Sequence, residues 1–181
     1  MIASLGLIGC GAFGEFALRH LAPFFRVLVH DDRRDLEPLT RLYNVQAGSL
    51  AAAAACDVVV LAVPVQKLRP VVLQIREFVR PGALVIDVCS VKLKPAEMLL
   101  ELLPPEVDIV LTHPLFGPQS GKNGISGLNV AVCHGRGERT ECVATFLRER
   151  LGLRVIETTP ERHDRELAYV QGLTHLIAKI M

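Results

Sequence analysis

The stretch Leu5-Gly6-Leu7-Ile8-Gly9-Cys10-Gly11-Ala12-Phe13-Gly14 joins a short apolar run to three glycines spaced Gly-x-Gly-x-x-Gly. The apolar run suits a buried strand, and the residues that follow the glycines have helical spacing. Gly9 permits a tight turn, Gly11 lets the backbone approach a pyrophosphate, and Gly14 lets helix and strand pack closely. The start of a helix also presents unpaired amides to a phosphate. We therefore expect a dinucleotide site here, formed by Gly9, Cys10, Gly11, Ala12, Phe13 and Gly14.

Apolar runs and helical patterns alternate along the rest of the chain. Continuous apolar runs suit strands that are buried on both faces of a sheet. Their alternation with helices predicts an α/β fold, a Rossmann-type doubly wound and mainly parallel sheet. The predicted strands are Ser4–Gly9, Arg26–His30, Val58–Val63, Ala83–Val88, Asp108–Thr112, Asn129–Cys133 and Arg154–Thr158. The predicted helices are Gly14–Ala22, Val65–Val79, Pro95–Leu103 and Glu138–Leu151, and the Ala51–Ala55 tract is expected to belong to another helix.

Two aspartates, Asp31 and Asp32, end the second predicted strand, about twenty residues beyond the glycines as the dinucleotide fingerprint requires. We expect Asp31 to be the ribose ligand, because a carboxylate there accepts hydrogen bonds from ribose hydroxyls and repels a 2′-phosphate. This favours NAD. Arg33 and Arg34 keep NADP open, since an arginine in this turn can hold the extra phosphate, although both also fit a solvated loop.

The strand Val58–Val63 ends in Val63-Pro64 at the edge where a cofactor crevice is expected. Val63 and Pro64 can back the cofactor rings. An ordinary strand-to-helix turn, with Pro64 opening the next helix, explains the same residues.

Composition excludes several classes of protein. The chain has 181 residues, half of them hydrophobic, and a formal net charge of +1, with no basic block that would follow a phosphate backbone. The start of the chain lacks the features of a signal peptide, and its apolar runs are too short to span a bilayer. We therefore expect a cytoplasmic protein with neither nucleic acid nor membrane as a partner.

The five cysteines are scattered and never have Cys-x-x-Cys spacing. This pattern argues against a disulfide framework and against a metal site. We expect all five to be buried thiols.

A histidine stands at the centre of the second informative stretch, Thr112-His113-Pro114-Leu115-Phe116-Gly117-Pro118-Gln119-Ser120-Gly121-Lys122-Asn123-Gly124. It follows an apolar strand, and the preceding strand ends in Asp87-Val88-Cys89-Ser90-Val91-Lys92. Since parallel strands carry their sites at the carboxyl edge, both ends should face one crevice.

These two segments, together with the glycine turn, His163-Asp164 and Gln171-Gly172-Leu173-Thr174-His175, resemble the prephenate and arogenate dehydrogenase family in their order along the chain. The similarity is closest to the plant-type branch and covers nearly the whole sequence. It implies oxidative decarboxylation of a cyclohexadienyl substrate, prephenate or arogenate, with hydride transfer to NAD(P) in tyrosine biosynthesis.

The resemblance also implies roles for individual residues. His113 would take the proton of the ring hydroxyl, which suits an imidazole near neutral pH. Ser90 would hold the same hydroxyl, and His175 would help to anchor the substrate. Gln119 and Ser120 belong to the entrance loop, where Gln119 replaces the glutamate of the plant-type pattern and removes a charge. Lys92 either lends positive charge near the substrate carboxylates or points into solvent, and no role is assigned to His163.

After Thr158 the pattern changes. Thr159 fits a helix cap, Pro160 the first turn, and Leu167, Val170, Leu173, Ile177 and Ile180 form an apolar stripe up to the last residue. We expect residues 1–158 to form the dinucleotide-binding domain. Residues 159–181 would be the first helix of a helical dimerisation domain that is truncated or missing, with a homodimer formed through this region. A helix that packs back on the sheet is the alternative.

Two other functions fit the same features. A relative of the β-hydroxyacid dehydrogenases shares the Rossmann half but relies on a catalytic lysine on a later helix, for which Lys179 is a poor candidate. A non-catalytic NAD-binding module would keep the fold without a complete substrate pocket. The sequence does not distinguish prephenate from arogenate.

Overall fold

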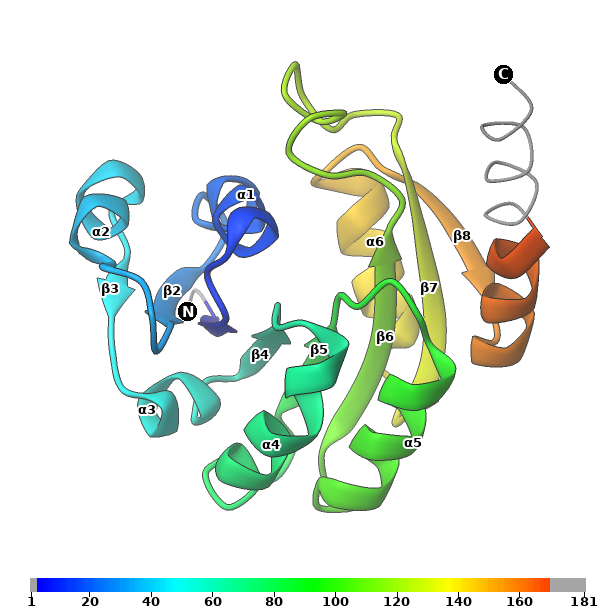
Figure 1. Ribbon diagram of the computed structural model, residues 1–181, viewed down its shortest axis with the longest axis horizontal. Helices are drawn as coiled ribbons and strands as arrows, with labels where there is room; N and C mark the ends of the chain where they lie inside the picture. Colours follow the sequence, from blue (N-terminus) through cyan, green and yellow to red (C-terminus); the bar gives the residue numbers. More distant parts are fainter. Residues whose placement is uncertain (1–2, 170–181) are drawn as a thin grey trace.

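The computed structural model describes residues 3–169. Its centre is a sheet in the order β3-β2-β1-β4-β5-β6-β7-β8, shown from left to right in Figure 1. The strands are β1 (Ser4–Ile8), β2 (Arg26–His30), β3 (Gln46–Ala47), β4 (Val58–Leu61), β5 (Leu84–Asp87), β6 (Asp108–Pro114), β7 (Asn129–Arg136) and β8 (Arg154–Thr158). The predicted Rossmann-type, mainly parallel sheet is therefore confirmed.

The strands run parallel from β3 to β6, but β7 pairs antiparallel with β6, and β8 is parallel to β7. The sheet is therefore parallel except where β6 pairs with β7, as a mainly parallel sheet allows. The connection between Pro114 and Asn129 contains no helix, so it reverses the chain beside β6 instead of crossing over the sheet.

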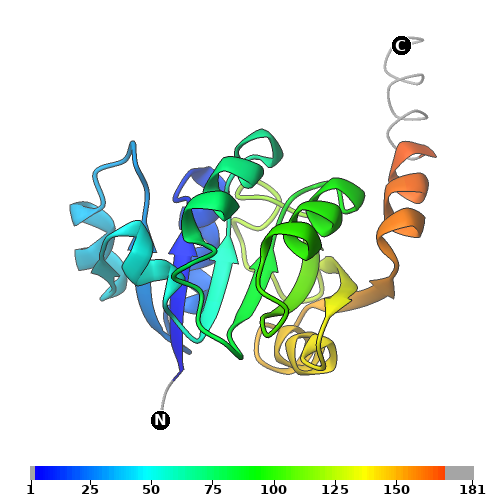
Figure 2. The same ribbon diagram turned by 90° about the horizontal axis from the view of Figure 1, so that it is seen from below.

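Helices cover both faces of the sheet (Figures 1 and 2). On one face Ala53, Leu68 and Leu99 of α3, α4 and α5 pack against buried residues of β4, β5 and β6. On the other, α1 and α2 pack over β1 and β2, while α6 packs against β6, β7 and β8. The helices are α1 (Ala12–Leu21), α2 (Glu37–Tyr43), α3 (Leu50–Ala54), α4 (Val65–Ile75), α5 (Leu93–Leu102) and α6 (Thr140–Glu149).

Burial on both faces explains the continuous apolar runs. In β1, Leu5 and Leu7 enter the core under α1 and α2, while Gly6 faces α3. A Cβ atom at Gly6 would lie 1.9 Å from the Ala53 carbonyl oxygen, so this position must be glycine for α3 to pack on the sheet.

Two short elements, α2 and β3, have no counterpart among the predicted ones. The two residues of β3 are both exposed, so they carry no apolar signal. Only Leu39 is buried in α2, and one buried position leaves no helical stripe to detect.

The expectation of five buried cysteines is wrong for Cys142. Four are buried, but Cys142 is exposed in the first turn of α6. The buried residues of this helix are Val143 and Ala144, which turn its Cys142 side toward solvent.

Residues 160–169 are helical and lie at the β8 end of the molecule in both ribbon views. Thr159 caps this helix as predicted, since its side-chain oxygen accepts a hydrogen bond from the Arg162 amide at 3.3 Å. The apolar stripe from Val170 onward lies outside the described residues. Among residues 3–169, no helix is long and apolar enough to cross a membrane.

An apolar cavity of about 410 Å³ lies between α1, α6 and the sheet. Phe16, Ile86 and Phe146 are among its lining residues, whereas Gly11, Asp31 and His113 are not. Phe13, predicted as a cofactor residue, does line the cavity, as does Phe116 of the loop after β6.

Candidate functional site

Three glycines shape the turn between β1 and α1 in different ways. Gly9 has a φ of +93°, and a Cβ atom there would lie 2.7 Å from the Ala62 carbonyl oxygen. A Cβ atom at Gly14 would lie 2.2 Å from the Gly9 carbonyl oxygen, so glycine is required for α1 to pack against the turn. At Gly11, the N-cap of α1, a Cβ atom would meet no protein atom within 4 Å. The space in front of Gly11 and the helix amides is thus open to a phosphate group.

Asp31 is tied to this glycine turn. Its Oδ2 accepts a hydrogen bond from the Cys10 amide at 2.7 Å, and its Oδ1 accepts from the Arg33 and Arg34 amides at 2.9 and 3.1 Å. Partial burial alone would raise the pKa of Asp31, but these three amides outweigh it and the pKa is lowered. Asp31 is therefore an ionised carboxylate beside the turn, while the Cys10 side chain is buried in the core.

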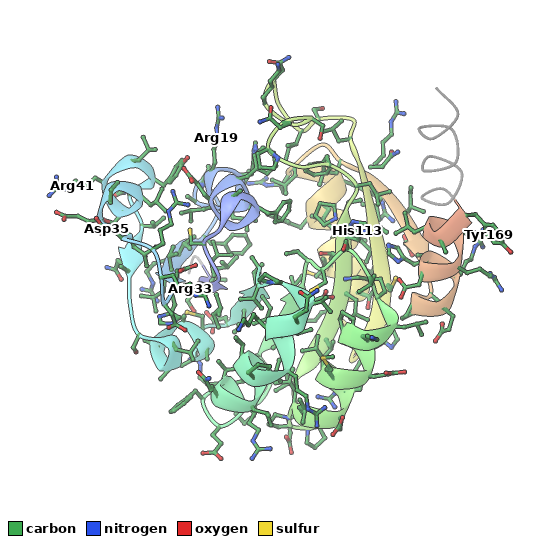
Figure 3. All side chains as sticks on the ribbon, viewed as in Figure 1. Arg19, Arg33, Asp35, Arg41, His113 and Tyr169 are labelled. Carbon is green, nitrogen blue, oxygen red and sulfur yellow. The ribbon has the colours of Figure 1, made fainter. Side chains whose placement is uncertain are left out.

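The neighbouring charged residues are arranged differently. Asp32 is largely exposed and its Oδ1 lies 2.9 Å from His30 Nε2, so it does not join the glycine turn. The Arg34 guanidinium donates to the Cys10 carbonyl oxygen at 2.8 Å and to Glu15 at 2.6 Å. Arg33 is exposed on the β2 side of the molecule, where Figure 3 labels it.

Val63 and Pro64 follow β4. Val63 is half-buried against the core, and its Cγ1 would lie 2.8 Å from a Cβ atom at Gly9. Pro64 is exposed and is the N-cap of α4, as expected of a residue that opens a helix. Of these two residues, Val63 lies against the glycine turn and Pro64 begins the next helix.

The carboxyl ends of β5 and β6 are joined by a buried ion pair. Lys92 Nζ lies 2.8 and 2.6 Å from the two carboxylate oxygens of Asp87 and donates to the Thr112 carbonyl oxygen at 2.6 Å. Both side chains are 0% exposed. Burial raises the pKa of Asp87, and the Lys92 ammonium opposes that shift. The prediction that Lys92 points into solvent is therefore wrong, because Asp87 and the Thr112 carbonyl oxygen hold its ammonium inside the protein. Its other role, positive charge near the substrate carboxylates, stays a prediction.

His113 is half-buried near the end of β6 and is labelled at the centre of Figure 3. Its Nδ1 lies 3.0 Å from His163 Nε2, and the ring planes meet at 71°. Burial, followed by the neighbouring His163 and Lys92, lowers the pKa of His113 to about 4, with Asp164 acting in the opposite direction. The imidazole is therefore neutral at neutral pH.

The contact with His163 was not anticipated from the sequence. His163 is 4% exposed, and its Nδ1 lies 2.7 Å from Asp164 Oδ1. Asp164 also accepts hydrogen bonds from the Lys92 and Leu93 amides at 2.7 and 3.0 Å. The available signal was the adjacent His163-Asp164 pair in the first turns of a capped helix, but its partner is fifty positions away in sequence.

The remaining predicted site residues are less closely connected. Ser90 is exposed in the turn between β5 and α5, while Gln119 and Ser120 are exposed in the loop after β6. Ser120 Oγ accepts a hydrogen bond from the Gly117 amide at 2.9 Å. Among residues 3–169, the structure gives no hydrogen bond from His113 to any of these three. His175 lies outside the described residues.

The loop after β6 is nevertheless held near the glycine turn. Phe116 and Phe16 of α1 pack edge to face at 6.2 Å, and a Cβ atom at Gly121 would lie 2.5 Å from the Phe16 ring. This contact fixes the base of the loop against the helix that begins at Gly11. Within the described part of the chain, no cluster of His, Cys, Asp or Glu has the arrangement of a metal site.

Most of this chain also matches a known protein family. Residues 30–155, more than half of the chain, match the family model described as "Prephenate dehydrogenase, nucleotide-binding domain". The chain belongs to the prephenate dehydrogenase family. The match begins at His30, so the glycine turn lies outside the matched residues.

A curated member of this family is similar over most of the chain. Arogenate dehydrogenase 2, chloroplastic, from Arabidopsis thaliana is 32% identical over 200 residues, covering 98% of this chain and 52% of the relative. The chain thus spans about half the length of this relative.

Two solved structures share the fold. Prephenate dehydrogenase from Aquifex aeolicus has a TM-score of 0.80 at 22% identity, covering 99% of this chain and 69% of that one. The A. aeolicus enzyme in complex with hydroxyphenyl propionate and NAD+ has a TM-score of 0.72 at 20% identity, covering 97% and 70%.

Proposed function

We propose that this chain catalyses the oxidative decarboxylation of prephenate or arogenate, with hydride transfer to NAD(P), in tyrosine biosynthesis. The observation that carries the proposal is the position of His113 at the same sheet edge as the glycine turn. Because β1, β4, β5 and β6 are parallel, the carboxyl ends of β1 and β6 lie at one edge. Family membership supplies the reaction class.

The residues at this edge fit a dinucleotide. The open space in front of Gly11 and the amides that begin α1 would hold the pyrophosphate. Asp31 would accept a hydrogen bond from the adenosine ribose, since Oδ2 accepts only one amide and keeps a further lone pair. We propose NAD as the cofactor, because the ionised Asp31 would repel a 2′-phosphate, and because the fold neighbour from A. aeolicus forms a complex with NAD+. When bound, the nicotinamide accepts the hydride.

His113 and Ser90 would act on the ring hydroxyl of the substrate. His113 Nε2 would remove the proton of this hydroxyl while the hydride leaves the ring carbon that bears the hydroxyl. Ser90 would hold the hydroxyl in position. Loss of carbon dioxide then aromatises the ring, so the protein mainly aligns the reacting groups.

Several finer assignments belong to the same proposal. Residues 1–158 would form the cofactor domain, and the chain from 159 would continue into a helical region that forms a homodimer. Gln119, Ser120 and His175 would complete the substrate site. The cytoplasmic location also stays a prediction.

One experiment tests the function. The chain is incubated with NAD or NADP and with prephenate or arogenate, and reduced nicotinamide and the aromatic product are measured. Reduction with one of the two acids is expected, with NAD preferred. Tight NAD binding without reduction by either acid would favour the passive nucleotide-binding module instead.

His113→Asn is the matching variant. Loss of a general base is expected to lower kcat by about 10²–10⁴-fold, while NAD affinity stays unchanged because His113 is not part of the glycine turn. The control is His134→Asn, an exposed histidine that bonds Thr140 and should leave kcat unchanged. Full activity of His113→Asn would refute the assignment of the base.

A further inference from the structure

The side chains of Asp164, His163 and His113 form a continuous line. Asp164 Oδ1 lies 2.7 Å from His163 Nδ1, and His163 Nε2 lies 3.0 Å from His113 Nδ1. The two imidazoles come from different parts of the fold, His113 from β6 and His163 from the helix of residues 160–169. Each ring uses one nitrogen toward the other, and Asp164 occupies the second nitrogen of His163.

Donor and acceptor chemistry determines which nitrogen of each imidazole carries the proton. An ionised carboxylate only accepts hydrogen bonds, so His163 Nδ1 must carry the proton toward Asp164. Asp164 is ionised, because hydrogen bonds from Leu93, His163 and Lys92 outweigh its partial burial and lower its pKa. A neutral His163 therefore has an unprotonated Nε2, which accepts the proton on His113 Nδ1. His113 is then left with a bare Nε2.

Two features favour a neutral His163 over a protonated one. The side chain is 3% exposed, and an additional charge at such a site is costly to desolvate. The Asp164 carboxylate is also satisfied by two backbone amides, so it does not require a cation.

The unprotonated nitrogen of His113, Nε2, is not engaged by the described residues. His113 is only half-buried, and within residues 3–169 its Nε2 has no hydrogen-bond partner. In the described residues, the buried polar side-chain atoms without a partner are His20 Nε2 and Thr158 Oγ1, and His113 Nε2 is not among them. With respect to residues 3–169, the lone pair of His113 Nε2 is thus accessible.

We propose that His163 and Asp164 are positioning residues that hold His113 in the tautomer with the proton on Nδ1, so that Nε2 is always available as the base. This inference rests on the proposed function for its purpose, but the tautomer itself is a property of the chain alone. His163 and Asp164 touch no reacting atom and act only through His113.

The tautomer is measured directly in the full chain. The protein is labelled with ¹⁵N in its histidines, and long-range ¹H–¹⁵N correlations at neutral pH identify the protonated nitrogen of each ring. The expected result is a proton on Nδ1 of His113 and on Nδ1 of His163. A proton on Nε2 of His113, or on both nitrogens of His163, would overturn the proposal whatever the turnover.

Two substitutions of His163 separate positioning from packing. His163→Gln keeps an amide oxygen that can accept from His113 Nδ1, so the His113 signature is expected to remain. His163→Leu keeps a buried side chain without an acceptor, so His113 is expected to lose the Nδ1-protonated signature. The control, His134→Gln, alters an exposed histidine and should change neither ring. A retained signature in His163→Leu would contradict the proposal.

Turnover supplies a second readout. With the cyclohexadienyl acid that the wild-type chain oxidises, kcat of His163→Leu is expected to fall by about 10²–10⁴-fold with little change in KM, while His163→Gln recovers most of it. Equal losses in both variants would indicate a merely structural role. If the wild-type chain reduces no cofactor, the proposed function fails, while the spectra still decide the tautomer.

Discussion

At the residue scale, a buried ion pair between Lys92 and Asp87 lies next to the candidate site. Both groups are fully buried, and Lys92 also holds the Thr112 carbonyl oxygen directly before His113. Removing one partner leaves an uncompensated buried charge, which typically costs about 3–5 kcal/mol. Lys92→Met is therefore expected to lower the free energy of unfolding by about that amount, measured by urea denaturation.

A second variant distinguishes charge from packing. Asp87→Asn combined with Lys92→Met removes both charges and should recover part of the lost stability. Lys94→Met, two positions away and exposed, is the control and should change stability by less than about 0.5 kcal/mol. Equal stability of Lys92→Met and wild type would show that the pair is not formed.

At the scale of elements, two glycines of the turn between β1 and α1 differ: Gly14 is packed against protein, and Gly11 faces open space. Gly14→Ala places a Cβ atom 2.2 Å from the Gly9 carbonyl oxygen, so the start of α1 must shift. A loss of about 1–3 kcal/mol, typical of overpacking, is expected. Gly11→Ala meets no protein atom, so its thermal unfolding should resemble that of the wild type while NAD affinity falls.

Thermal unfolding and calorimetric titration with NAD measure these two effects separately. The pair serves as its own control, because the substitutions are chemically identical and three positions apart. Unchanged NAD affinity in Gly11→Ala would mean that no cofactor approaches this face of the turn.

At the scale of the whole molecule, Asp164 joins the last described helix to the start of α5. It accepts the Lys92 and Leu93 amides at the start of α5, where Lys92 as N-cap makes no side-chain capping bond. Asp164→Ala leaves these amides without an acceptor, at a cost of about 1–3 kcal/mol. Hydrogen exchange at both amides is expected to accelerate roughly 10- to 100-fold.

Ser49→Ala is the matched control, since Ser49 caps α3 by accepting the Ala52 amide. It should accelerate exchange in α3 and leave Lys92 and Leu93 unchanged. Unaltered exchange at these two amides in Asp164→Ala would show that the helix of residues 160–169 is not tied to α5.

Local patterns determined much of this protein. The run Leu5–Ile8, the glycines after it and the alternation of apolar strands with helices predicted the Rossmann-type sheet, because each signal arises from neighbouring residues. Thr159 likewise indicated its helix, since a cap and its amide are three positions apart. Short elements such as β3, which bury almost nothing, gave no such signal.

Tertiary structure decided the rest. The reversal of β7 depends on how the segment after Pro114 returns to the sheet, which no local periodicity records. Lys92 is buried because β5 and β6 lie side by side, and His163 meets His113 although fifty residues separate them. The sequence by itself determined the longer strands and helices and the residue types that end each predicted strand. Only the folded chain decided which of those ends share hydrogen bonds and charges, because such contacts join residues that are distant along the sequence.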